Sequence, residues 1–178
     1  MFDFEPIEPE TRRHMVQELD FDIANNKLYI NPFLKKDREA LYLSLLRTAL
    51  TSGNPETFAA VITANDLLIE KHTYTKEGLE IEARVPATFN TTLAAGEFNR
   101  YFMHAVCLTA LQQGKPVVEI YRAKAVSKPR QQTDDRLGRR IDPQVLLTDL
   151  RKTNFENPSA FGLGGPNSGL SIRIPPEG

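Results

Sequence analysis

The chain has a single cysteine, almost no net charge and no long hydrophobic run, and each of these absences excludes a class of protein. With Cys107 alone, a disulfide framework within one chain is impossible, and we expect a buried thiol that acts as a small hydrophobe. The net charge of −1 selects neither nucleic acid nor a membrane surface as a partner. No apolar run approaches the ~18 residues of a membrane span, and the acidic start MFDFEPIEPE has no secretory signal. We therefore expect no membrane contact, and function in or assembly from a cytoplasm.

The sequence also lacks motifs that carry catalysis. The histidines at 14, 72 and 104 have no cysteine or second histidine at ligand spacing, so we expect no metal site. No serine lies in a G-x-S-x-G context, which argues against a nucleophile elbow. The glycines at 162–165 form no phosphate loop, because no Lys-Ser/Thr pair ends them and no predicted strand leads into them. We expect no cofactor, no metal and no catalytic residue.

One trio of residues has the spacing of acid–base machinery. Glu97, Arg100 and His104 lie at i, i+3 and i+7, so they share one face of a helix. In a cleft, such a group could move protons. The interpretation that we favour is an ion-paired stripe on the less buried side of the helix.

A second set of residues suggests a metal-dependent nuclease. Glu82, Glu97, Glu119 and Lys124 have the residue types that such a site uses, two or three carboxylates on Mg²⁺ with a lysine beside them. The usual acid-x-Lys arrangement is absent, however. Acids that alternate along the wet face of a strand explain the same residues.

Residues 90–114 are predicted to form the longest helix. Asn90 is a suitable N-cap, and Gly114 can take the left-handed conformation that ends a helix. The second half should be buried on more than one face, and Phe102 and Leu108 should anchor the core. Apolar residues recur at helical spacing at Leu93, Phe98, Tyr101, Phe102, Ala105, Val106, Leu108 and Leu111.

Four shorter helices are predicted from the same periodicity and from local start signals. They span about residues 10–24, about 37–53, a stretch from Asn54-Pro55, and a stretch from Asp142-Pro143. In the last two, a capping side chain precedes a proline at the first helical position. The tight turn at Gly53 joins the second and third helices into a helical hairpin.

Strands are predicted at residues 67–75, 79–85 and 117–126. The first two surround Gly78, which supplies the positive φ of a tight hairpin. The second alternates apolar and charged residues, which indicates one covered and one wet face. The fold class is therefore α+β and mostly helical, with a small mixed sheet (hairpin plus crossover strand) backed by the long helix. We divide the chain into an N-terminal arm (1–10), one α+β domain (11–152) and an extended Gly/Pro-rich tail (153–178).

The two ends of the chain are predicted to be extended arms that dock on a surface. The tail is too rich in glycine and proline to fold alone, yet its residues 170–174 alternate like a strand added to a sheet edge. That edge can belong to a neighbour, which we favour, or to the chain's own sheet. The predicted assembly interface is Phe2, Phe4, Leu170, Ile172 and Ile174.

A basic segment lies between the third strand and the last helix. Residues 122–140 carry seven basic side chains against two acidic ones, which suits contact with phosphates. A solvated loop, or pairing with the acidic arm (Asp3, Glu5, Glu8 and Glu10) on an adjacent subunit, explains the same charges. The predicted contact patch is Lys128, Arg130, Arg136, Arg139 and Arg140.

Three stretches resemble uncharacterised proteins of phages and prophages. They are GEFNRY (96–101), EIYRAK (119–124) and GPNSGLS (165–171). The resemblance brings no catalytic residues and implies a virion component. We therefore expect a head–tail connector or adaptor subunit that forms a ring with itself, contacts a portal or tail component, and is assembled in the host bacterial cytoplasm. The alternatives are a nucleic-acid-binding accessory protein and, third, the nuclease.

Overall fold

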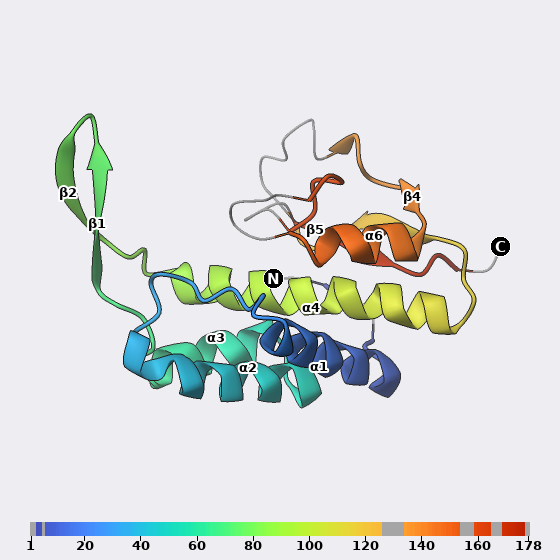
Figure 1. Cartoon of the computed structure of the whole chain (residues 1–178), viewed down its shortest axis with the longest axis horizontal. Coiled ribbons are helices and arrows are strands. Elements are labelled where there is room, and N and C mark those ends of the chain that lie inside the picture. The colour runs from blue at the N-terminus through green and yellow to red at the C-terminus, as the bar shows by residue number, and fades with distance from the viewer. Residues whose placement is uncertain (1–2, 5, 126–133, 154–158, 165–168, 177–178) are drawn as a thin grey trace.

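Helix α4 (Phe89–Gln112) runs through the middle of the molecule and organises the other elements. A computed structural model of the chain describes residues 3–4, 6–125, 134–153, 159–164 and 169–176. Three helices lie on one side of α4, and a small sheet with one further helix lies on the other (Figure 1). The fold is α+β and mostly helical, as predicted. The remaining elements are α1 (Pro9–Ala24), the 3-10 turn η1 (Lys36–Arg38), α2 (Glu39–Ser52), α3 (Pro55–Ala64), β1 (Lys71–Lys76), β2 (Leu79–Arg84), β3 (Val118–Arg122), β4 (Arg140–Ile141), α6 (Pro143–Leu150) and β5 (Leu170–Arg173).

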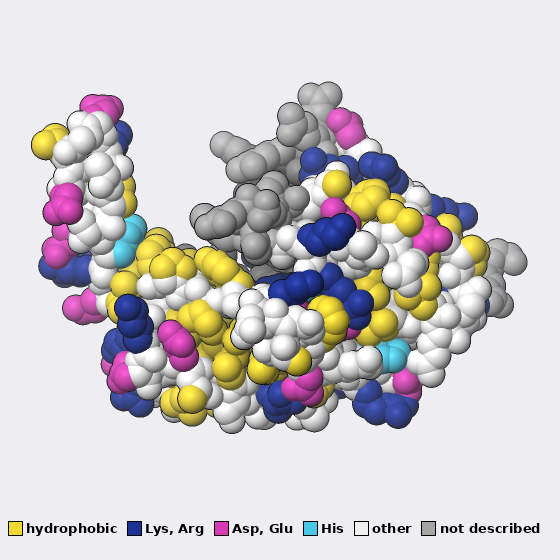
Figure 2. Space-filling view, in the orientation of Figure 1, with side chains coloured by type: hydrophobic (Ala, Val, Ile, Leu, Met, Phe, Trp, Pro, Cys, Tyr) yellow, Lys and Arg dark blue, Asp and Glu magenta, His cyan; other side chains and the backbone are white. Residues whose placement is uncertain are grey.

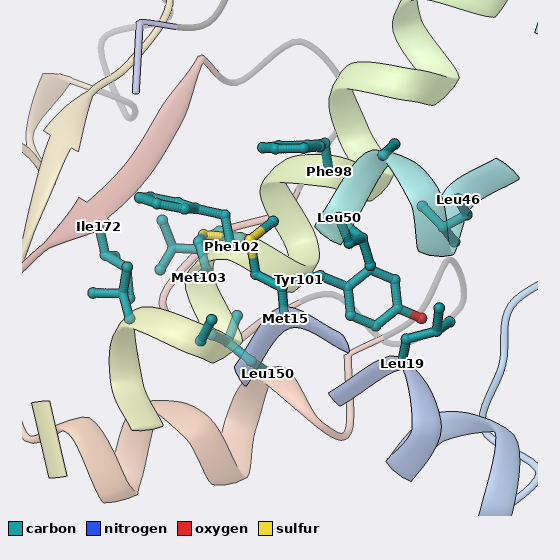
Figure 3. Close-up of a cluster of buried hydrophobic side chains, with 14 of the residues drawn as sticks. Met15, Leu19, Leu46, Leu50, Phe98, Tyr101, Phe102, Met103, Leu150 and Ile172 are labelled. Atoms are coloured by element: carbon teal, nitrogen blue, oxygen red, sulfur yellow. The ribbon is translucent and has the colours of Figure 1, made fainter. Parts of the chain in front are cut away.

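The core is continuous across both sides of α4. Figure 3 shows side chains from α1, α2, α4, α6 and β5 packed together. Phe102 is buried, as predicted, whereas Leu108 is only partly buried and packs against the core from its edge. Within the described ranges, no helix combines the length and hydropathy needed to cross a bilayer.

Of the N-cap side chains predicted at Asn54, Asn90 and Asp142, two are confirmed. Asn54 and Thr57 form a reciprocal capping box at α3, and Asp142 accepts two backbone N–H groups at α6. The prediction for Asn90 is wrong, because α4 begins one residue earlier and the Asn90 amide donates to Thr63 Oγ1 at 2.7 Å. That bond joins α4 to α3. The Asn90 side chain therefore makes a long-range contact in place of the predicted cap.

The predicted mixed sheet with a crossover strand is wrong. Among the described residues, β1 and β2 pair only with each other, and β3 lies between β4 and β5 in a separate antiparallel sheet. The hairpin projects from the N-terminal end of α4, whereas β3 follows the other end of the helix (Figure 1). The length of α4, 24 residues or about 36 Å, separates the two sheets.

The C-terminal strand docks on its own chain. Ile172 pairs with Ile120 of β3, and the side-chain amide of Asn99 on α4 donates to the Leu170 carbonyl at 2.9 Å. Leu170 and Ile172 are fully buried. The strand therefore pairs within its own chain. The prediction that Leu170 and Ile172 face a neighbour is wrong, because α4 covers both side chains. Ile174 is only partly buried.

The described part of the N-terminal arm also lies against its own domain. The Phe4 ring packs on Phe98 and Phe102 of α4, with ring centroids 5.4 and 4.7 Å apart. The Tyr121 hydroxyl donates to the Asp3 carbonyl at 3.4 Å, which holds the arm beside β3. Phe4 is therefore a contact within the chain, and the predicted interface residue Phe2 lies outside the described residues.

Candidate functional site

The trio on α4 lies on a buried face, so the expectation of a stripe on the less buried side is wrong. His104 is fully buried and Glu97 nearly so, because α4 is covered on both sides. Two acids of α1, Glu18 and Asp22, face the trio and are also fully buried. These side chains, with Tyr101 and Arg151, form what we call the buried polar cluster. The sequence reasoning missed its α1 half.

Glu18 is the centre of the first half of this cluster. Its carboxylate accepts hydrogen bonds from Arg151 Nε at 3.0 Å and Arg151 Nη2 at 2.5 Å, and from His104 Nδ1 at 3.1 Å. Burial opposes ionisation, but the bonds from His104 and Arg151 outweigh it and hold the pKa of Glu18 at about 2. Burial lowers the pKa of His104 in spite of Glu18, so the ring is neutral near pH 7 and donates through Nδ1–H.

Asp22 is the centre of the second half. Its Oδ2 accepts from Arg100 Nη2 at 2.7 Å and from the Tyr101 hydroxyl at 3.2 Å. Glu97 lies beside Arg100, and burial raises the pKa of its carboxyl although Arg100 opposes the change. This half therefore joins α1 to α4 through a charge-assisted pair.

The arrangement of the cluster suits a structural role better than proton transfer to a substrate. General acid–base groups must reach the reacting atom, directly or through one water. Here Glu18, Asp22 and His104 have no exposed surface, and their hydrogen bonds join α1 to α4 and to Arg151, which follows α6. Cys107 is buried nearby, and burial raises the pKa of its thiol, which disfavours the reactive thiolate.

The residues of the nuclease hypothesis do not converge. Glu82 lies on the projecting hairpin and pairs with Lys71 at 2.6 Å. Glu119 lies in β3 and pairs with Arg173 at 2.7 Å, and Glu97 is buried in α4. In the described ranges, no group of three or more His, Cys, Asp or Glu side chains is placed to hold a metal ion.

The described part of the basic segment is engaged within the chain. Arg136 donates to the Gly162 carbonyl at 3.0 Å, and Arg139 stacks on Phe161 with its guanidinium carbon 5.2 Å from the ring centre. Arg140 Nε lies 3.5 Å from Glu119 Oε2. Lys128 and Arg130 lie outside the described residues. Within the chain, no ion pair between described residues joins these arginines to the acidic arm, and pairing across subunits stays a prediction.

The hairpin β1–β2 forms where it was predicted, but the prediction of a covered apolar face is wrong. Its two central turn residues, Glu77 and Gly78, both have positive φ, as a tight hairpin requires. One face was expected to be covered, yet Leu79 is 69% exposed and Tyr74 is 43% exposed. Figure 2 shows the hairpin standing away from the rest of the molecule.

The register of the hairpin places its apolar residues on one face. Tyr74 pairs with Ile81, and Lys76 pairs with Leu79 near the turn. Because alternate strand residues point to the same side, these four side chains share a face with the pair His72 and Ala83. We call Tyr74, Lys76, Leu79 and Ile81 the hairpin tip.

Aromatic packing fixes the base of the hairpin to the body. The rings of Phe89 and Phe33 lie 4.9 Å apart, Phe33 and His72 lie 4.6 Å apart, and His72 and Tyr74 lie 5.7 Å apart. A backbone hydrogen bond from Ile69 to the Phe33 carbonyl supports this base. The series of rings joins the base of the hairpin to the body and ends at Tyr74, so that Leu79 beyond it stays exposed.

A groove lies beside the C-terminal half of α4. It has a volume of about 180 Å³ and lies between the N-terminal arm, the first turn of α1, α4 and the end of β5. Its apolar lining includes Ile7, Phe102, Val106 and Ile174, and Glu8 belongs to its polar lining. We call it the distal groove, because the hairpin projects from the other end of α4 (Figure 1).

Comparison of the chain with models of protein families, with curated proteins and with solved structures finds no match. Function is therefore argued from the hairpin, the distal groove and the buried polar cluster.

Proposed function

We propose that this chain is a structural protein of a phage particle, a head–tail connector or adaptor subunit that forms a ring and catalyses no reaction. The observation that carries the proposal is the projecting hairpin with its uncovered apolar face. A two-stranded hairpin is marginally stable in water, so a partner surface on this face would stabilise it. Its partners are copies of itself and other virion proteins such as a portal or tail component.

Two further observations support this role. The three stretches that resemble phage proteins, at 96–101, 119–124 and 165–171, suggest the setting. In the buried polar cluster, Glu18 and Asp22 of α1 hydrogen-bond to side chains of α4, which suits a rigid subunit. Assembly from copies of one chain is the ordinary route to a symmetric particle component.

The nucleic-acid-binding alternative has weaker support. A binder needs basic side chains that reach phosphates. Arg136, Arg139 and Arg140, the described members of the predicted patch, instead contact a carbonyl, an aromatic ring and a carboxylate of the same chain.

Size-exclusion chromatography with light scattering, with and without DNA, tests the proposal. We expect the wild-type protein to form an oligomer of defined size, visible as a ring by electron microscopy. The double variant Tyr74→Ser/Leu79→Ser should be a folded monomer, because both side chains are exposed in the single subunit. Thr75→Ser, on the opposite face of β1, is the matched control and should assemble normally. A wild-type monomer that changes size only with DNA would support the nucleic-acid-binding role instead.

A further inference from the structure

Among the described residues, the hairpin tip and the distal groove are two surfaces with matching chemistry. One is a projecting apolar face with Leu79 at its end, and the other is a concave apolar site at the far end of the same helix. We propose that the hairpin tip of one copy inserts into the distal groove of a second copy. This inference rests on the proposed ring-forming role and names the surfaces that would form the ring contact.

The size and lining of the groove suit the side chain at the tip. A cavity of ~150 Å³ with an apolar lining admits a benzene-sized group. The distal groove, at about 180 Å³, is larger, and Ile7, Val106 and Ile174 supply apolar walls. The isobutyl group of Leu79, now 69% exposed, therefore fits and would leave water on insertion.

Lys76 at the hairpin tip and Glu8 in the groove carry opposite charges. The other charged residues that line the groove, Glu10 and Arg173, pair with Arg13 and Glu119 of the same chain. Lys76 is paired across the hairpin with Leu79 and lies on the same face. In the groove, Glu8 is exposed and follows Ile7 directly in the chain. Neither Lys76 nor Glu8 makes a salt bridge with any other residue that the structure describes. Insertion of Leu79 beside Ile7 brings these two opposite charges together, which favours this alignment of the two copies.

The positions of the two surfaces make the contact repeatable. The hairpin joins the N-terminal end of α4, whereas the groove surrounds its C-terminal half, at the other end of the long axis (Figure 1). A contact between two different patches is heterologous, so every copy has one of each to offer its neighbours. Such contacts give a ring if the rotation closes and a filament if it does not. We therefore infer that a second copy of the chain, and not an unrelated protein, occupies the distal groove.

Disulfide trapping tests the contact directly. The variant Leu79→Cys/Gln113→Cys has one thiol at the hairpin tip and one beside the groove, where Gln113 is exposed. Leu79 lies on the hairpin beyond the N-terminal end of α4, and Gln113 lies at the C-terminal end of the helix. The two thiols therefore cannot bridge within one copy. Cys107 is buried and does not compete. Under mild oxidation we expect a ladder of covalent multimers that reductant removes.

The control is Leu79→Cys/Ser44→Cys, because Ser44 is also exposed but lies on α2 outside the groove. It should give no ladder. Assembly by light scattering without a ladder in Leu79→Cys/Gln113→Cys would overturn this docking and leave the ring-subunit role standing. A protein that stays monomeric at every concentration would overturn both.

Charge exchange provides an independent readout. Lys76→Glu or Glu8→Lys alone should weaken association on the order of tenfold, because each places like charges together. The double variant Lys76→Glu/Glu8→Lys should regain most of the loss. Equal losses in the singles and the double variant would overturn the pairing of hairpin and groove.

Discussion

At the scale of single residues, Glu18 joins three separate parts of the chain. It lies on α1 and accepts hydrogen bonds from His104 on α4 and from Arg151, which follows α6. All three elements meet at one fully buried carboxylate. Removal of the Glu18 carboxylate leaves His104 buried without its acceptor and Arg151 without its ion-pair partner, which is costly.

Glu18→Ala should lower the free energy of unfolding by about 3–5 kcal/mol, the usual range for breaking a buried pair. Urea denaturation followed by far-UV circular dichroism measures the change. The control is Glu80→Ala on the exposed hairpin, which should stay within about 0.5 kcal/mol of wild type. If the two variants were equally stable, the cluster would contribute nothing to the fold.

The same carboxylate predicts a pH dependence with a definite sign. The pKa of Glu18 is about 2 in the folded protein and 4.5 in an unperturbed chain. A lowered carboxyl pKa gives stability that is present above the unfolded value and lost as pH falls through the folded value. The stability difference between wild type and Glu18→Gln should therefore shrink from about pH 5 to about pH 2. A difference that stayed constant over this range would refute the assignment.

Residue-level predictions succeeded where the cause was local. The caps at Asn54 and Asp142 depend on a few neighbouring residues, so the sequence reveals them. Asn90 and the burial of Glu97 depend on which helices lie against α4, and no local pattern encodes that. Helical spacing showed that Glu97, Arg100 and His104 share a face, but not that α1 brings Glu18 and Asp22 to it.

At the scale of elements, β5 and the hairpin have similar alternating patterns, but the apolar face is buried in β5 and exposed in the hairpin. Residues 170–174 and 79–85 both alternate apolar and polar side chains. The first is a buried strand of the core, and the second projects into solvent. The pattern identifies a strand with one apolar face, but it does not say whether the chain itself covers that face.

Truncation of a β5 side chain should therefore destabilise the single subunit. Ile172→Ala removes a fully buried group from the interface with α4 and should cost about 2–5 kcal/mol. The comparison is Leu79→Ala on the hairpin, which should change the unfolding free energy of the monomer little. Thermal melts at low protein concentration separate the two effects. A wild-type-like melt for Ile172→Ala would mean that the strand is not part of the core in solution.

At the scale of the whole molecule, the fold class was predictable and the partition of the strands was not. Helix lengths and strand positions follow from periodicity, which is local. Which strand pairs with which depends on packing between distant segments. The hairpin and β3 lie at opposite ends of α4 and belong to separate sheets.

The distribution of carboxylates over the whole molecule predicts that the purified protein cleaves no DNA with Mg²⁺ or Mn²⁺. Glu82, Glu97 and Glu119 lie on three elements, and two of them are held in ion pairs. Two-metal or one-metal hydrolysis needs carboxylates that converge on the ion. A supercoiled-plasmid assay with either cation checks this. Cleavage that Glu119→Ala abolishes would restore the nuclease hypothesis.

The pairing of β5 with β3 has a consequence for the order of folding. Their ion pair joins residues 54 positions apart, and the contact of Thr11 with Thr109 spans 98. Closing loops of this length costs chain entropy before any contact repays it, so structures rich in distant contacts fold slowly. The turn between α2 and α3 closes a far shorter loop. The helical hairpin should therefore gain protection from hydrogen exchange early in refolding, and the β3–β5 pairing and the contact of α1 with α4 should form later.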